Sequence, residues 1–282
     1  MIRNMRLTKI GLLIITILTL LTSCKMEPEI PTETFDREVL TSLGTSGFYT
    51  IYESDIAYIG ESRDGLIFVE NRKSDVLALV IKNKETLNSI TYTFKPYESR
   101  IANVYEEGRY TILLKVQNYS DKSYDTLDSV GIDINPNKDK LDLYVSYYSN
   151  PDDSLEKVDN ILGTLGSTET EIVNNLYTYL EGFEYDNDLA EILSGEIHEI
   201  YRSSIEDTID NQSGVCIDIA NLGVTLLRRA GIPSRLVFGN YCGLYHAWIE
   251  YRLNEEWFMI DPVNKMSGLV GFSTAYVNDK YF

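Results

Sequence analysis

The first half of the chain alternates apolar and polar residues with a period of two. One such run, 90–94, places apolar side chains at every second position between threonines, and a second, 110–116, does so except at Leu113. A third run has apolar residues at Leu141, Leu143, Val145 and Tyr147. Glycines and an Asn135-Pro136-Asn137 turn separate the runs, which is the pattern of short antiparallel strands. We therefore predict a small antiparallel β domain over residues 41–150.

From Pro151 onward the apolar residues recur at helical spacing. The stretches 158–165 and 172–180 predict two helices, the second ending at Glu181-Gly182, and a polar segment of helix and loop follows up to residue 213. The clearest pattern lies at 215–230. Its apolar stripe contains Cys216, Ala220, Gly223, Leu227 and Ala230.

This helix is expected to end at Gly231, because a glycine there and a proline two residues later prevent its continuation. Cys216 then lies in the first turn, where unpaired N–H groups and the helix dipole stabilise a thiolate. A buried helical cysteine of no chemical consequence is the alternative. Asp218, also in the first turn, is expected to interact with the dipole.

The next segment predicts a β-hairpin. The stretches 246–252 and 255–261 are strand-like, with Leu253-Asn254 as the expected turn. In that register His246 faces Asp261, and directly opposed residues have Cβ atoms about 4.5–5.5 Å apart. A slip of one residue puts the two side chains on opposite faces, whereas a four-residue loop keeps them on the same face, one pair out of step.

Cys216, His246 and Asp261 are the residue types of thiol-based acyl transfer. A thiol needs a base to become a nucleophile, and that base needs a partner that orients it. A metal site made of the same three residues is a poor alternative, because zinc sites usually contain more cysteine or histidine. The sequence has no phosphate-binding glycine loop and no cofactor fingerprint, so we expect no cofactor and no metal. The other histidine, His198, is expected at or near the surface.

The N-terminus indicates export. A basic region precedes an apolar run, 10–21, that is shorter than the roughly 20 residues of a membrane span. The following Leu21-Thr22-Ser23-Cys24 resembles a bacterial lipobox, which implies lipid on Cys24. We predict a lipoprotein signal peptide at 1–23 and a tether at 24–40, with the protein anchored on the extracytoplasmic side of the bacterial membrane. An ordinary signal peptide and an uncleaved anchor helix are the alternatives.

The chain that remains after signal-peptide cleavage is strongly acidic. Cleavage after residue 23 removes three of the 25 basic residues, which leaves 22 against 43 acidic residues, a net charge of −21. Such a surface repels phosphate backbones, so we expect no nucleic-acid partner.

With Cys24 lipidated, Cys216 and Cys242 remain as thiols. We expect Cys242 to be a small residue of the core; the alternative is that it forms a reversible disulfide with Cys216 and so acts as a redox switch.

A family resemblance rests on several motifs in order. They are Tyr185-Asp186, Gly214-x-Cys216-x-Asp218, the segment 226–235 (LLRRAGIPSR), His246-Ala247-Trp248, and Trp257 before Asp261-Pro262. Together they resemble a transglutaminase-like domain of the bacterial type. The resemblance implies an α+β, papain-like fold over 155–282, with the cysteine-bearing helix packed on an antiparallel sheet. It also implies Cys216 as nucleophile, His246 as base and then acid, and Asp261 as orienter.

The implied activity is thioester chemistry on a protein or peptide amide, with hydrolysis favoured over cross-linking. The backbone N–H of Cys216 is the expected first oxyanion donor, and Gln212 and Tyr185 are candidates for the second. Trp248 is a candidate for lining the acyl cleft, although an aromatic residue in a sheet is more often part of the core. A lipoprotein that binds a protein or cell-wall partner without turnover is the alternative function. The oligomeric state is not written in the sequence.

Overall fold

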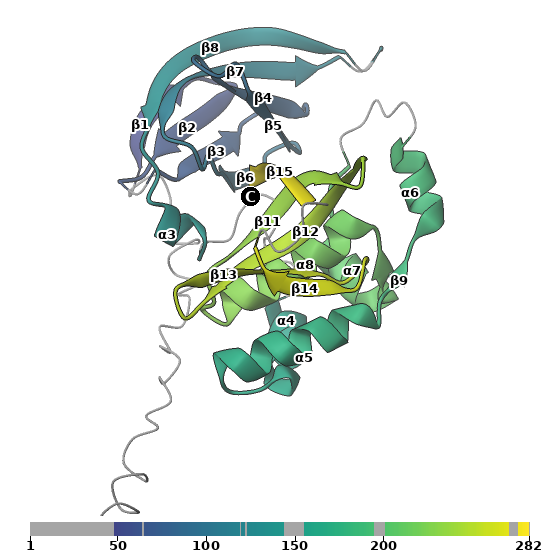
Figure 1. Cartoon of the computed structure of the whole chain (residues 1–282). Coiled ribbons are helices and arrows are strands. Elements are labelled where there is room, and N and C mark those ends of the chain that lie inside the picture. Colours follow the sequence, from purple (N-terminus) through teal and green to yellow (C-terminus); the bar gives the residue numbers. More distant parts are fainter. Residues whose placement is uncertain are drawn as a thin grey trace, which may run out of the picture. The chain divides into compact units, whose positions relative to one another are not determined.

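The computed structural model describes residues 48–63, 65–118, 120–121, 123–143, 155–194, 201–270 and 276–281. Its first part consists of eight strands in two four-stranded antiparallel sheets, which face each other in Figure 1. One sheet has the order β1-β2-β3-β6, with β1 Tyr49–Glu53, β2 Ala57–Glu61, β3 Ile67–Asn71 and β6 Ser99–Ala102. The other has the order β5-β4-β7-β8, with β4 Leu77–Asn83, β5 Ser89–Phe94, β7 Gly108–Gln117 and β8 Tyr124–Ile134.

Alternation of side chains builds the core of these sheets. Tyr92 and Phe94 of β5 and Ile112 and Leu114 of β7 are fully buried, whereas the residues between them are at least partly exposed. Leu113, which interrupts the polar face of β7 in the sequence, is half-buried. Burial of each such apolar side chain contributes about 1.5–3 kcal/mol, so the period-two pattern supplies both the strands and their packing.

The predicted strand at Leu141 is wrong. Residues 138–141 form a short helix, α3 (Lys138–Leu141), in which the amide N–H of Leu141 donates to the carbonyl of Asn137. The helical turn brings Leu141 into a core cluster with Phe48 and Tyr105, where its side chain is fully buried. Leu143, the next apolar residue of the predicted strand, lies in the turn that follows α3, and the rest of the predicted strand, from residue 144 onward, lies outside the described residues.

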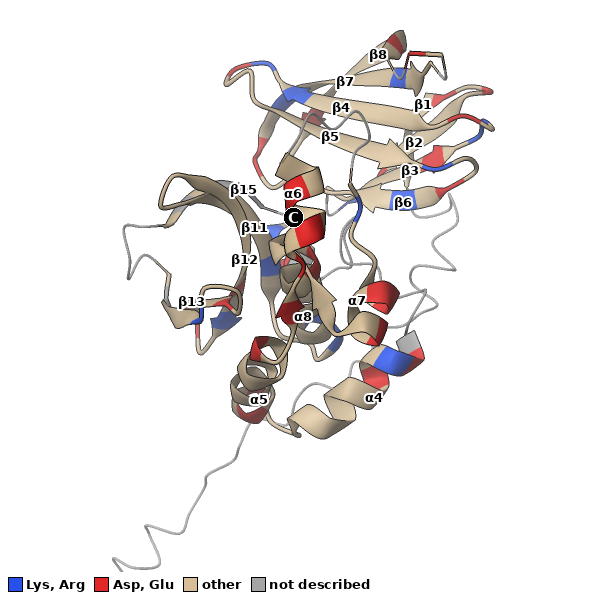
Figure 2. Cartoon of the chain, turned by 90° about the vertical axis from the view of Figure 1, so that its right-hand side faces the viewer, with Lys and Arg blue, Asp and Glu red and all other residues tan. Residues whose placement is uncertain are grey.

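The helices come next in the chain. Their bounds are α4 Leu155–Leu165, α5 Glu169–Glu181, α6 Asn187–Ser194, α7 Ile205–Asn211 and α8 Cys216–Arg229. The sequence predicts α4, α5 and α8 to within a few residues. Acidic residues, red in Figure 2, lie along α7. Lys157 of α4 binds two of them, Glu206 and Asp210, at 2.8 and 2.7 Å.

A five-stranded antiparallel sheet completes the fold. Its order is β14-β13-β12-β11-β15, with β11 Ser234–Tyr241, β12 Leu244–Leu253, β13 Glu256–Asp261, β14 Met266–Leu269 and β15 Tyr276–Tyr281. A two-residue parallel pairing of β9 (Glu184–Tyr185) with β10 (Ser213–Gly214) precedes α8. Helix α8 packs on β12, where a Cβ on Gly223 would lie 2.3 Å from the Cδ1 of Ile249. The predicted α+β arrangement, a cysteine-bearing helix on an antiparallel sheet, is confirmed.

Buried and part-buried polar contacts join the strand-rich region to the helices. Arg228 of α8 is 2% exposed and donates from a guanidinium nitrogen to the Tyr105 hydroxyl at 3.1 Å. Arg202, just before α7, makes two hydrogen bonds of 2.8 and 2.9 Å to the carboxylate of Glu98. Removing an Arg from solvent is costly unless its guanidinium group is hydrogen-bonded, so separating the strand-rich region from the helices would break favourable contacts.

Several predictions concern residues that the structure does not describe. The signal peptide, Cys24 and the tether all precede residue 48, and the boundary expected near residue 150 falls within 144–154. Among the helices that are described, none combines the length and apolarity needed to cross a bilayer. The N-terminal features therefore stay predictions from the sequence.

The close approach of α8 to β12 predicts the effect of adding one methyl group. Gly223→Ala should lower the free energy of unfolding by about 1–3 kcal/mol, because the new Cβ overlaps the Ile249 side chain. Adding Ile249→Val, which deletes Cδ1, should recover part of that loss in a denaturant titration. Gly163→Ala in α4 is the matched control: no atom lies within 4 Å of its Cβ position, so it should be neutral or stabilising by up to about 1 kcal/mol. Equal stability of the two alanine variants would contradict the packing described here.

Candidate functional site

The first turn of α8 is held by a buried carboxylate. Asp218 is 2% exposed, and its Oδ2 accepts from the backbone N–H of Val215 at 3.0 Å. The Tyr201 hydroxyl donates to the same carboxylate at 2.8 Å. A Cβ on Gly214 would lie 2.6 Å from the Cβ of Asp218, so only glycine fits there. The Gly-x-Cys-x-Asp motif therefore fixes where Cys216 leaves the loop and enters the helix.

The hairpin places His246 and Asp261 on one face, but not in the predicted register. The turn is Asn254-Glu255, both with positive φ (51° and 65°), and Arg252 pairs with Trp257 instead of Glu255. The expected turn at Leu253-Asn254 is therefore wrong by one residue, which moves the pairing by two. An even shift preserves the face, as the alternative with a four-residue loop requires, so the contact survives.

His246 and Asp261 form a short buried contact. The imidazole Nε2 lies 2.7 Å from Asp261 Oδ2, and the two side chains are 9% and 0% exposed. Three further donors hold the carboxylate: the Tyr276 hydroxyl at 2.8 Å, and the side-chain and backbone N–H groups of Asn264 at 2.8 and 3.1 Å. A buried carboxylate with this many donors stays ionised and fixed in place.

The same contacts determine which imidazole nitrogen faces the sulfur. An ionised carboxylate only accepts hydrogen bonds, so Nε2 of His246 carries a hydrogen and donates to Asp261. The amide nitrogen of Asn264, 3.1 Å from Nε2, is itself a donor and is directed to Asp261 instead. Cys216 shares a side-chain hydrogen bond with His246, which leaves Nδ1 as the nitrogen for the thiol.

These contacts set the charge of the site. Burial alone lowers the pKa of His246, but the hydrogen bonds and negative charges of Asp261 and Cys216 outweigh it and raise the pKa to about 9. Burial also pushes the pKa of Asp261 upward, yet the hydrogen bonds and charge of His246, with Asn264, leave that pKa below its ordinary value. At pH 7 the pair is therefore an imidazolium and a carboxylate.

The three candidates for substrate contact lie in different settings. Tyr185 of β9 pairs with Gly214, is 38% exposed, and interacts electrostatically with Cys216, so it borders the site. Gln212 ends α7 in a left-handed conformation and is exposed; its carbonyl accepts from Glu184, and in the described part of the chain no hydrogen bond joins its side chain to Cys216.

Trp248 does not line a cleft. It is fully buried in a cluster with Val237 and Met259, and its ring stacks behind the imidazole of His246 at a centroid distance of 6.2 Å. Trp248 is therefore not a substrate contact, and the place in the core expected of an aromatic residue in a sheet is confirmed. The reason is geometric, because the side chain points into the sheet packing that supports His246.

Cys242 is exposed, contrary to the prediction that it is buried. It and Gly243 form the two-residue turn between β11 and β12, with φ values of 51° and 90°. Both positions require a left-handed backbone, and such a turn projects into solvent. Cys216 and Cys242 are both free thiols.

His198 and Cys24 lie outside the described residues. Within the described residues, no group of Asp, Glu, His and Cys side chains is arranged to hold a metal ion.

Sequence reasoning missed Tyr276, Asn264 and Tyr201. Asn264 follows Asp261-Pro262 closely, so a turn that returns to the carboxylate was a readable signal. Tyr276 comes from β15, which joins the sheet beside β11 rather than beside β13. No local pattern in the sequence indicates that pairing.

A comparison with protein families finds one match, which covers the segment that carries this site. Residues 157–262 match the family model of the transglutaminase-like superfamily, and all three residues of the site lie within that match. Residues 157–262 are thus similar to the transglutaminase-like superfamily, in the region where the motifs implied such a domain. No curated protein matches the chain.

Several solved structures are similar to the chain at low identity. A protein from Cytophaga hutchinsonii, described as a presumed cysteine protease, has 15% identity and a TM-score of 0.38, and the match covers 77% of this chain and 86% of that one. The periplasmic domain of TgpA from Pseudomonas aeruginosa has 16% identity, a TM-score of 0.33 and coverage of 78% and 76%. Red sea bream transglutaminase has 14% identity, a TM-score of 0.30 and coverage of 72% and 49%. With TM-scores below 0.5, these likenesses carry no argument about substrate or activity.

The donors to Asp261 predict the effect of removing one hydroxyl. Tyr276→Phe should lower the free energy of unfolding by about 1–3 kcal/mol, because it leaves a buried carboxylate with one donor fewer. Tyr97→Phe, at a side chain that is 70% exposed, should change it by less than about 0.5 kcal/mol. Denaturant unfolding of both variants measures the difference. Indistinguishable stabilities would show that Tyr276 does not hold the carboxylate.

Proposed function

We propose that the protein is a cysteine-dependent amide hydrolase that acts on a protein or peptide through Cys216, His246 and Asp261. The observation that carries this proposal is the chain of contacts from Asp261 to Nε2 of His246 and from the other side of the imidazole to Cys216. The family match supports it, because the matched segment contains all three residues. Export and lipid attachment at Cys24 stay predictions from the sequence.

In this mechanism the resting site is a thiolate and an imidazolium. The Cys216 thiolate attacks the amide carbonyl and forms a C–S bond, and the carbonyl oxygen becomes an oxyanion. Nδ1–H of His246 then gives its proton to the amide nitrogen as the C–N bond breaks, so an amine leaves and a thioester remains. Asp261 keeps the imidazole oriented through both steps.

Water completes the cycle. The neutral imidazole takes a proton from water as its oxygen attacks the thioester, and collapse of the second oxyanion releases a carboxylic acid and restores the thiolate. Cys216 is half-buried, so the site is not closed to solvent, and we propose water as the acceptor of the acyl group.

The oxyanion in both steps needs two donors. Cys216 is the first residue of α8, and its backbone N–H is one of the four that have no partner within a helix. We assign this N–H as the first hydrogen-bond donor to the oxyanion. Tyr185, which borders the sulfur, is the better of the two candidates for the second donor, because its hydroxyl is a neutral donor at neutral pH: burial and the charges of Cys216 and Asp218 raise the pKa of Tyr185.

The proposal predicts that Cys216 reacts faster than Cys242. Solvent exposure alone would predict the opposite order. Iodoacetamide at pH 7 should alkylate half-buried Cys216 at least about tenfold faster than exposed Cys242, because the imidazolium keeps the former as a thiolate. His246→Gln should slow alkylation of Cys216 and leave Cys242 unchanged. Peptide mapping by mass spectrometry gives both rates in one sample. Faster alkylation of Cys242 would refute the proposed nucleophile.

The reaction itself is read from the products. Mass spectrometry of candidate surface proteins and peptides before and after treatment separates a gain of about one dalton, a cleavage and a cross-link. Cys216→Ser should remove the modification, and Cys242→Ser is the matched control that should retain it. A cross-linked product would replace hydrolysis by amine transfer. Modification that survives in Cys216→Ser would end the enzymatic proposal.

A further inference from the structure

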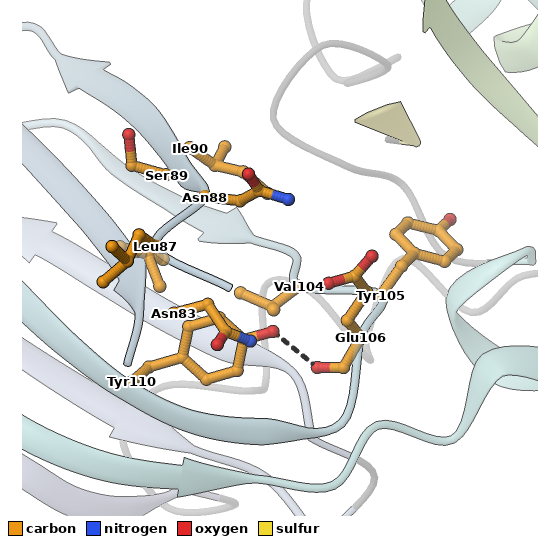
Figure 3. A pocket seen from close by; sticks show the side chains of 10 residues that line it. Asn83, Leu87, Asn88, Ser89, Ile90, Val104, Tyr105, Glu106 and Tyr110 are labelled. Carbon is orange, nitrogen blue, oxygen red and sulfur yellow. Dashed lines mark hydrogen bonds between the residues drawn. The ribbon is translucent and has the colours of Figure 1, made fainter. Parts of the chain in front are cut away.

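The strand-rich region contains a cavity of about 380 Å³ that the proposed reaction does not use. It lies between the β4–β5 turn and the segment that links β6 to β7 (Figure 3). Its size falls within the roughly 300–1,000 Å³ of small-ligand sites. In Figure 3, Leu87 and Asn88 stand on one side and Glu106 on the other, with Val104 between them.

Hydrogen bonds brace both walls of the cavity. Asn83 is 5% exposed, and its side-chain oxygen accepts from the backbone N–H groups of Glu85 and Thr86 at 2.8 and 3.0 Å, which fixes the turn. Asn83 also shares a side-chain hydrogen bond with Tyr110, whose hydroxyl donates to the carbonyl of Glu106 at 2.8 Å. The two walls are thus joined through a single chain of contacts, so the cavity is preformed.

The turn carries backbone strain where it meets the cavity. Leu87 has a φ of 63°, a conformation that is rare for a residue with a side chain, and its side chain is 65% exposed. The turn thus presents an apolar side chain at the edge of the cavity. Ile81, Ile90 and Val104 supply the remaining apolar surface.

The charge of the lining selects the ligand. Glu106 is the one acidic or basic residue among those that line the cavity; its side chain is exposed, and in the part of the chain that the structure describes it has no ion-pair partner. Nearby basic side chains are directed elsewhere: Arg109 binds Asp133 at 3.1 Å, and Lys84 lies beside Gly131. Asn88 and Ser89 add neutral polar groups at the rim.

From these contacts we infer that the cavity binds a basic side chain of a polypeptide. The aliphatic stem of a lysine or arginine packs on the apolar wall, and its charged end reaches the carboxylate of Glu106. Tyr105 lines the same cavity and accepts a hydrogen bond from Arg228 of α8, so the site belongs to the unit that carries Cys216. The inference does not depend on the proposed reaction.

Binding of lysine derivatives to the mature chain carrying Cys216→Ala tests this site. Titration with Nα-acetyl-lysine methylamide, followed by amide NMR, should shift resonances of residues 83–90 and 104–110. Nα-acetyl-norleucine methylamide, which lacks the ammonium group, should bind at least about fivefold more weakly. Glu106→Gln should weaken lysine binding about fivefold, whereas Glu107→Gln, at an exposed neighbour outside the cavity lining, should leave it unchanged.

Three outcomes would overturn the inference: no shifts at tens of millimolar ligand, equal binding of the norleucine compound, or unchanged lysine binding in Glu106→Gln. The comparison of the two compounds uses the same protein, so it stands even if a variant does not fold. None of these outcomes bears on Cys216, which is absent from the chain used. Failure of this site and failure of the proposed reaction are therefore distinguished.

Discussion

The arrangement of the site depends on one buried carboxylate. Asp261 is inaccessible to solvent and receives hydrogen bonds from His246, Tyr276 and Asn264. A charge in this position is stable only because every contact offers it a proton donor. The carboxylate in turn holds Nε2 of the imidazole and keeps it protonated at neutral pH. In the mechanism that we propose, the reactivity of the sulfur depends on this charge.

The helix that carries the sulfur is fixed by close packing at two points. At its start, Gly214 leaves room for Asp218, which binds the backbone of Val215 and so defines the first turn. Near its middle, Gly223 lets α8 approach β12 closely. The two glycines therefore set the position of Cys216 relative to the strand that begins just before His246. Glycine is needed at each point for space, since neither has a positive φ.

Those parts of the fold that rest on local patterns could be predicted from the sequence. Helix α8 has an apolar stripe and a Gly231 and Pro233 stop signal, so its bounds were readable. The contact between His246 and Asp261 could also be predicted. The two side chains share a face of the hairpin whenever the pairing shifts by an even number of residues, and the observed pairing differs from the predicted one by two. The predictions that failed depended on tertiary packing. Trp248 and Leu141 are drawn into cores, and the exposure of Cys242 depends on the tight turn it occupies.

The remaining parts of the site come from distant segments. Tyr276 reaches Asp261 through β15, which pairs with β11, and Arg228 meets Tyr105 across 123 residues. The periodicity of a single sequence does not indicate such contacts, because each partner lies in an element that would form without the other. The cavity beside Glu106 is of this kind as well, since its walls come from two separate strand connections.

The charge of His246 is the central claim, and its imidazole resonances measure it most directly. The chain has only two histidines, so His198→Gln protein gives an unambiguous NMR signal for His246. A pH titration of its ring ¹⁵N shifts should show a pKa of about 9, with the Nε2 proton retained above that pH. A pKa at or below about 6.5, the ordinary value, would show that Asp261 and Cys216 do not act on this imidazole as described.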